Sequence, residues 1–129
     1  MKPETIVSAF PYLYENVRPP HRDYRTTRSS YAMKHDVEHL LDEYCSGEEL
    51  KSALRETVPF HVGAPNYYNE VNFGFYVKPK FDLHWLRTKP TTRPKGARLA
   101  HWEAYQTALA WASQHQASQT APAPASGSQ

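Results

Sequence analysis

Two histidines and a glutamate in the order H-x-x-E-H are the first residues in the chain that could do chemistry. His35 and His39 are four residues apart and share one face of a predicted helix, with Glu38 beside them. The same order occurs in zinc peptidases, where two imidazoles hold the metal and the carboxylate acts as base. A zinc site needs a further protein ligand, and Glu103 in the downstream predicted helix is the candidate. Because the pattern is short and the chain small, a zinc hydrolase is kept as a remote alternative, and we expect no metal and no cofactor.

Nucleophilic catalysis has less support. The single cysteine, Cys45, precedes a predicted helix whose N-terminus would favour a thiolate, but no activating partner lies near it in the sequence. A buried structural cysteine is the favoured interpretation. The chain also lacks a nucleophile elbow, a Walker motif and a dinucleotide fingerprint. We therefore predict a protein that is not an enzyme.

Charge is distributed unevenly along the chain although the net charge is only +2. Residues 18–35 hold five Lys/Arg against one Asp, residues 36–49 hold six carboxylates and no Lys/Arg, and residues 78–98 hold seven Lys/Arg against one Asp. Two basic segments thus flank an acidic one. The basic segments could bind phosphate, or the first could fold onto the acidic helix, and both interpretations stay open.

Aromatic residues are interleaved with these basic segments, a pattern typical of grooves that bind single strands by stacking bases and pairing phosphates. Phe73-Gly74-Phe75 is similar to the centre of an RNA-binding strand motif, but the flanking positions of that motif are missing. The alternative is that both Phe side chains face the core, which would leave Tyr76 toward solvent. The predicted nucleic-acid or partner-binding residues are Arg18, Arg22, Arg25, Arg28, Tyr31, Lys34, His35, Tyr76, Lys78, Lys80, Trp85, Arg87, Lys89, Arg93 and Lys95.

Helical patterns account for much of the chain. Apolar residues at three- and four-residue steps predict helices over residues 30–44 and 97–115, and Pro3 favours a short helix over residues 3–10. Ser29 or Ser30 is the expected cap of the first of these. Ser46 and Glu49 form a capping box for a further helix that ends at Pro59. Only one or two residues would then join the two central helices.

Alternating apolar residues predict a hairpin with strands at residues 58–62 and 71–77, and residues 81–86 are interpreted as a third strand rather than a turn of helix. Residues 18–28 are interpreted as a basic connecting arm. The expected fold is α+β: two short helices joined by a tight turn, a β-hairpin or small antiparallel sheet, and a C-terminal helix.

Length and composition favour one domain. A chain of 129 residues can bury a core without a disulfide or a metal, and one cysteine permits no internal disulfide. Residues 117–129 carry no charge, aromatic or large aliphatic side chain, so we predict a disordered tail after a compact domain of residues 1–116. No apolar run is long enough to span a membrane and no signal core is present, so the cytoplasm is the expected location.

One part of the chain is similar to known sequences. The run Ser30-Tyr31-Ala32-Met33-Lys34-His35 is followed by Glu38, Tyr44, Ser46, Glu49-Leu50, Ala53-Leu54 and Asn72-Phe73. This order resembles a group of small, mostly uncharacterised proteins from phages, plasmids and bacterial genomes, over roughly residues 29–77. The chain departs from their pattern at Cys45, and Gly47 follows Ser46 without the usual Asn. The resemblance implies a mobile-element protein but no activity, and it draws attention to Tyr31, Lys34, His35 and Glu38.

Two functions follow from these features. The first is a non-enzymatic accessory protein of a mobile genetic element that binds nucleic acid. The alternative is an inhibitor that binds a host protein or ribonucleoprotein complex of a defence system, such as an anti-CRISPR protein. Its exposed anchors would be Tyr67, Tyr68, Tyr76, Trp85 and Trp111. The sequence does not predict an oligomeric state.

Overall fold

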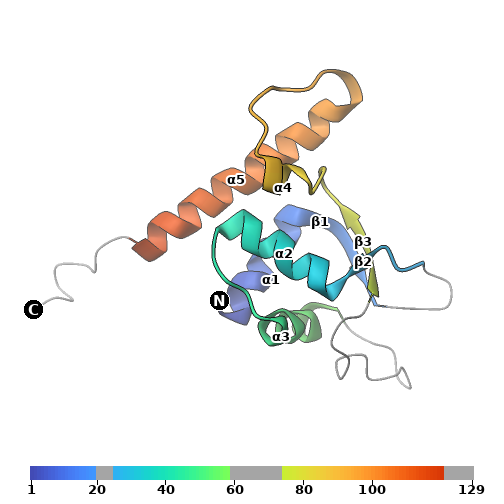
Figure 1. Cartoon of the computed structure of the whole chain (residues 1–129), viewed down its shortest axis with the longest axis vertical. Helices are drawn as coiled ribbons and strands as arrows, with labels where there is room; N and C mark the ends of the chain where they lie inside the picture. Colours follow the sequence, from blue (N-terminus) through green and yellow to red (C-terminus); the bar gives the residue numbers. More distant parts are fainter. Residues whose placement is uncertain (20–24, 59–73, 121–129) are drawn as a thin grey trace, which may run out of the picture.

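A computed structural model of the chain describes residues 1–19, 25–58 and 74–120. These residues form an α+β fold, as predicted (Figure 1). The α-helices are α1 (Pro3–Leu13), α2 (Ser30–Leu41), α3 (Gly47–Thr57), α4 (Trp85–Thr88) and α5 (Leu99–Thr120). The strands are β1 (Tyr14–Arg18), β2 (Arg28–Ser29) and β3 (Gly74–Pro79). Within the described ranges, no helix combines the length and apolarity needed to cross a membrane.

The sheet is small and antiparallel, with strand order β1-β3-β2. β3 pairs with β1 from Tyr14 opposite Pro79 to Arg18 opposite Tyr76, and the register shifts beside Glu15. On its other edge β3 pairs with β2, with Arg28 opposite Phe75. The predicted strand around Phe75 and Val77 is therefore present as β3. Its partners β1 and β2, however, come from segments that the sequence did not predict as strands. The predicted partner strand at residues 58–62 begins at Val58, which instead ends α3, and its remainder lies outside the described residues.

Thr27 and Gly74 explain how β2 approaches β3 so closely. The Thr27 hydroxyl donates to the Val77 carbonyl and accepts from the Val77 amide, both at 2.9 Å, so a side chain extends the ladder just before β2 begins. A Cβ placed on Gly74 would lie 2.7 Å from the Thr26 Cβ and 2.9 Å from its Oγ1. Gly74 is therefore explained by the close approach of Thr26, in the segment that leads into β2, to the start of β3.

Gly74→Ala is expected to destabilise the protein by about 1–3 kcal/mol, the usual cost of forcing extra atoms into a packed site. Urea unfolding followed by circular dichroism measures this. Gly47→Ala is the matched control, because no heavy atom beyond its chain neighbours and the backbone of its own helix lies within 4 Å of its Cβ position. Equal stability of the two variants would contradict the packing explanation.

The central helices begin where the sequence predicts. Ser29 caps α2 by accepting from the Ala32 amide, and Ser46 with Glu49 forms the complete capping box of α3. The end of α2 differs from the prediction, because Asp42 adopts a left-handed conformation and stops the helix at Leu41. The connection to α3 is consequently longer than one or two residues. Tyr44, predicted on the buried stripe, is 65% exposed.

The core lies between the helices and one face of the sheet, and it includes Ile6 and Leu13 of α1, Met33 and Val37 of α2, and Leu50 and Leu54 of α3. A second group is aromatic. The rings of Phe81, Trp85, Trp102 and Tyr105 contact one another with centroids 5.3–6.5 Å apart, and they join α4 to α5. The predicted strand at residues 81–86 is wrong, because this segment forms a turn that leads into α4.

α5 is longer than predicted. It runs to Thr120 and crosses the molecule above α2 in Figure 1. The Gln116 side-chain amide donates to the Leu41 carbonyl, which satisfies a free acceptor at the C-terminus of α2. Residues 117–120, predicted as the start of the tail, therefore continue the helix, and residues 121–129 lie outside the described residues.

Candidate functional site

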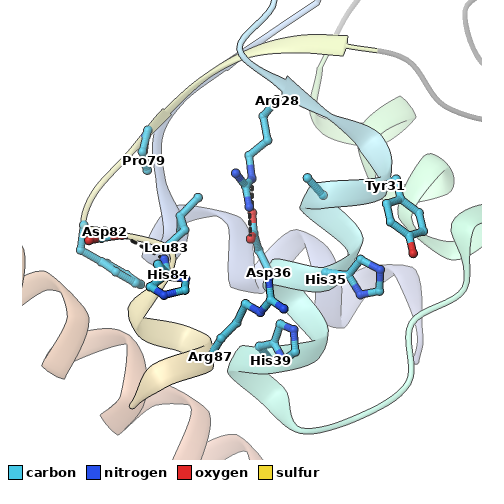
Figure 2. Close-up of a pocket in the computed structure, with 12 residues that line it drawn as sticks. Arg28, Tyr31, His35, Asp36, His39, Pro79, Asp82, Leu83, His84 and Arg87 are labelled. Atoms are coloured by element: carbon cyan, nitrogen blue, oxygen red, sulfur yellow. Dashed lines mark hydrogen bonds and ion pairs between the residues drawn. The ribbon is translucent and has the colours of Figure 1, made fainter. Parts of the chain in front are cut away.

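A cleft of about 840 Å³ separates α2 from the segment that leads from β3 into α4. Figure 2 shows its charged and aromatic residues. From β2 and α2 come Arg28, Tyr31, His35, Asp36 and His39, and from the segment at α4 come Asp82, His84 and Arg87. The cleft thus brings together four of the predicted binding residues: Arg28, Tyr31, His35 and Arg87.

Asp36 organises one wall of this cleft. Its buried carboxylate accepts two hydrogen bonds from the Arg28 guanidinium and one from the Tyr14 hydroxyl at 2.7 Å. Burial raises the pKa of Asp36, while its bonds to Arg28 act against that rise. Burial also raises the pKa of Tyr14 well above its ordinary value, so the hydroxyl keeps its proton and donates. The charge of Arg28 is therefore neutralised within the fold. This agrees, for Arg28, with the alternative in which the first basic segment folds onto the acidic helix.

Three rings lie along the side of α2 that faces the cleft. Tyr31, His35 and His39 recur every four residues and share one helix face. The rings of Tyr31 and His35 meet edge to face with centroids 4.4 Å apart, and those of His35 and His39 are 6.1 Å apart. The Glu38 carboxylate holds His35 Nδ1 at 2.9 Å and accepts from the Cys45 amide at 3.2 Å.

The H-x-x-E-H residues do not form a metal-binding set. Glu38 is held by His35 and by the Cys45 amide, and Glu103 is exposed on α5. Over residues 1–19, 25–58 and 74–120, no three His, Cys, Asp or Glu side chains are grouped so that they could hold a metal ion. The zinc interpretation therefore lacks the ligands that it requires in this part of the chain.

The opposite wall carries cationic and titratable side chains. Arg87 extends from α4 across the cleft toward α2 (Figure 2). None of the described residues forms a hydrogen bond or an ion pair with its guanidinium. The exposed His84 is placed by a turn in which its amide donates to the Asp82 carboxylate at 3.0 Å. That carboxylate in turn pairs with Arg98 at 3.0 Å, so its charge is compensated.

A second cleft of about 820 Å³ lies beside the first, between the end of α2, the segment after α4, and α5. His39 lines both clefts, and Lys89 and Arg93 supply the cations of the second. Asp42 also lines the second cleft and opposes the binding of an anion there. The two clefts together place Arg87, Lys89 and Arg93 on adjoining surfaces.

The basic residues predicted as a binding surface fall into two groups. Arg28 pairs with Asp36, Lys78 pairs with Glu15 at 3.0 Å, and Lys34 lies over the rings of Tyr31 and Tyr44. A second group has no hydrogen bond or ion pair from its side chains to the described residues: Arg25, Lys80, Arg87, Lys89, Arg93 and Lys95. Arg18 ends β1 and is exposed, and Arg22 lies outside the described residues. Among the predicted binding residues that the structure describes, the uncompensated charge is therefore concentrated after β3.

Several aromatic residues predicted at the surface are packed inside. Trp85 is only 9% exposed and lies in the aromatic group of α4 and α5. Phe75 is fully buried, so the base-stacking interpretation of Phe73-Gly74-Phe75 is wrong for Phe75. Trp111 is partly buried and stacks on Tyr12 with centroids 4.9 Å apart. Tyr76 is half-buried, while Tyr67, Tyr68 and Phe73 lie outside the described residues.

Cys45 is fully buried, as its structural interpretation predicted. Burial raises its pKa to about 12, and the neighbouring carboxylates of Glu49 and Glu38 contribute to the rise. A thiol with this pKa is protonated at neutral pH and makes a poor nucleophile. The sequence does not predict His84 as a binding residue, and it offers His39 only as a metal ligand. Their shared place in the clefts depends on the packing of α2 against α4, which leaves no local sequence signal.

Comparisons with protein families, with curated proteins and with solved structures find no significant match to this chain.

Proposed function

We propose that this protein binds nucleic acid through the two adjoining clefts. The observation that carries the proposal is the run from Arg87 to Lys95, which holds four Lys/Arg and no carboxylate. None of these four side chains is neutralised by the described part of the chain. Arg87, Lys89 and Arg93 line the clefts, and His39 connects them.

A polyanion suits this arrangement better than a single small anion. The cations are spread over two clefts, so no single phosphate could contact all of them, whereas successive phosphates of one strand could. Uncompensated Lys and Arg side chains also supply the electrostatic part of nucleic-acid binding, which is independent of base sequence. Because part of the chain resembles mobile-element proteins, we further propose that it is a non-enzymatic accessory protein of a phage or plasmid.

Arg87→Ala together with Arg93→Ala is expected to weaken nucleic-acid binding and reduce its dependence on salt. For a single strand, each lost phosphate contact lowers the slope of log K against log salt by about 0.7, so the double variant should lose about 1.4. Fluorescence anisotropy with a labelled oligonucleotide of mixed sequence, titrated between about 50 and 200 mM salt, measures both quantities.

Lys78→Ala is the matched control. It removes one positive charge where the test variant removes two, from a side chain that is paired with Glu15 on β1 and lines neither cleft. Its salt slope should equal that of the parent. The proposal fails if the parent protein does not bind at about 50 mM salt, or if the Arg87 and Arg93 variant binds as the parent does.

The defence-inhibitor alternative has less support than nucleic-acid binding. Of its five anchors, Trp85 is buried and Trp111 is packed against Tyr12, so neither offers a free indole ring. Tyr67 and Tyr68 lie outside the described residues. One defined protein partner captured from cells that express candidate defence complexes, together with no nucleic-acid affinity, would reverse this preference.

A further inference from the structure

We infer that Tyr31 stacks on a base of a single-stranded nucleic acid, and that the first cleft therefore prefers single strands to duplexes. The inference rests on the proposed function, because it concerns the same cleft. Its basis is the position of an exposed, oriented phenol ring at the rim of a cleft that carries cations on its other wall.

Tyr31 is unusual in its exposure. Among the described residues, Tyr31 and Tyr44 are the large hydrophobic side chains that are exposed, at 54% and 65%. Both rings contact Lys34, whose Nζ lies 5.6 Å from each ring centroid. Of these two tyrosines, Tyr31 lines the first cleft and Tyr44 lines neither of the two clefts, so Tyr31 places its exposed ring beside the proposed path of the phosphates.

A chain of contacts connects this ring to the core. The Cys45 amide donates to Glu38, Glu38 holds His35 Nδ1, and the imidazole of His35 meets the Tyr31 ring at an interplanar angle of 84°. Cys45 is itself buried in the core. A platform that is held in place before binding loses less conformational entropy when a base stacks on it.

The surroundings of Tyr31 supply the rest of a single-strand site. Lys34 holds a cation over the Tyr31 ring, and Arg87 offers another on the opposite wall of the cleft. Aromatic platforms combined with such cations bind single strands of any sequence, because every base has a π face. In a duplex those faces are stacked inside the helix, and Tyr31 would find no base to contact.

The test compares three DNA probes that carry the same label: a single strand of about 12 nucleotides, an abasic strand of the same length and charge, and a duplex. Anisotropy titrations use the parent protein, Tyr31→Ala and Tyr31→Phe. The parent should bind the base-bearing strand about 5- to 150-fold more tightly than the abasic strand, the range expected for one stacked base. Tyr31→Ala should abolish that preference without changing the salt slope, and Tyr31→Phe should retain it.

Tyr44→Ala is the matched control, because it removes the other exposed ring that contacts Lys34 but lines neither cleft. It should leave the preference unchanged. Equal affinity of the parent for base-bearing and abasic strands, or a preference that survives in Tyr31→Ala, overturns the inference while nucleic-acid binding stands. Failure of all three probes to bind at about 50 mM salt overturns both proposals.

Discussion

Trp85→Ala is expected to lower the free energy of unfolding by about 3–5 kcal/mol, the usual cost of removing a large buried aromatic side chain. The indole is 9% exposed and contacts the rings of Phe81, Trp102 and Tyr105. It therefore joins α4 to α5, and its loss would leave a cavity between them. Guanidinium unfolding followed by circular dichroism measures the effect without depending on Trp fluorescence.

The matched control is Trp111→Ala, which removes the same side chain from a partly buried position where it stacks on Tyr12. Its cost should be clearly smaller than that of Trp85→Ala. If Trp85→Ala kept nearly the parent's stability but lost nucleic-acid or protein binding, Trp85 would be an interface residue, as its sequence context predicts. The packing described for α4 would then be wrong.

Asp36→Ala is expected to destabilise the fold by about 3 kcal/mol, because it removes one partner of a buried ion pair and leaves the other uncompensated. It deprives Arg28 of its carboxylate and Tyr14 of its acceptor, and these two residues come from β2 and β1. The Arg28 side chain is 30% exposed and can reach water, so the loss of stability should lie at the lower end of the range for buried ion pairs. Urea unfolding by circular dichroism measures it.

Two further variants separate the ion pair from a general effect of charge. Glu43→Ala removes one carboxylate from an exposed position and should change stability little. Arg28→Ala combined with Asp36→Ala should cost less than the sum of the two single variants, because each single variant leaves one member of the ion pair without its partner. Strict additivity would show that the Arg28–Asp36 contact contributes nothing to stability.

Local signals in the sequence were enough to predict most helix starts. The caps at Ser29 and Ser46 and the helix that starts at Pro3 depend on neighbouring residues, and they appear where expected. The strands were harder to predict. β2 has two residues, too few for an alternating pattern. It forms because Thr27 and Arg28 contact β3, which is far away in the sequence.

The sequence predicted several of the residues that contribute to the candidate site but not where in the fold the site lies. The sequence identified the basic segments and Tyr31, yet it could not show which cations are neutralised. Lys78 and its partner Glu15 are far apart in the sequence and meet only because β1 pairs with β3. The burial of Trp85 could not be predicted for a related reason, since it depends on α5 packing against α4.

The pairing of β1 with β3 affects how the protein must fold during its synthesis. Tyr14 lies opposite Pro79, so the first strand to be made waits for a partner 65 positions later in the chain. At about 5–20 residues per second, translation of that interval takes roughly 3–13 s. Until β3 has been made, the edge of β1 that pairs with it is exposed. Tyr14 then lacks the strand that helps to cover it, although Asp36, which accepts the hydrogen bond of its hydroxyl, has already been made. Helices can form as the chain emerges, but the sheet that holds β1 and β2 together depends on the late arrival of β3.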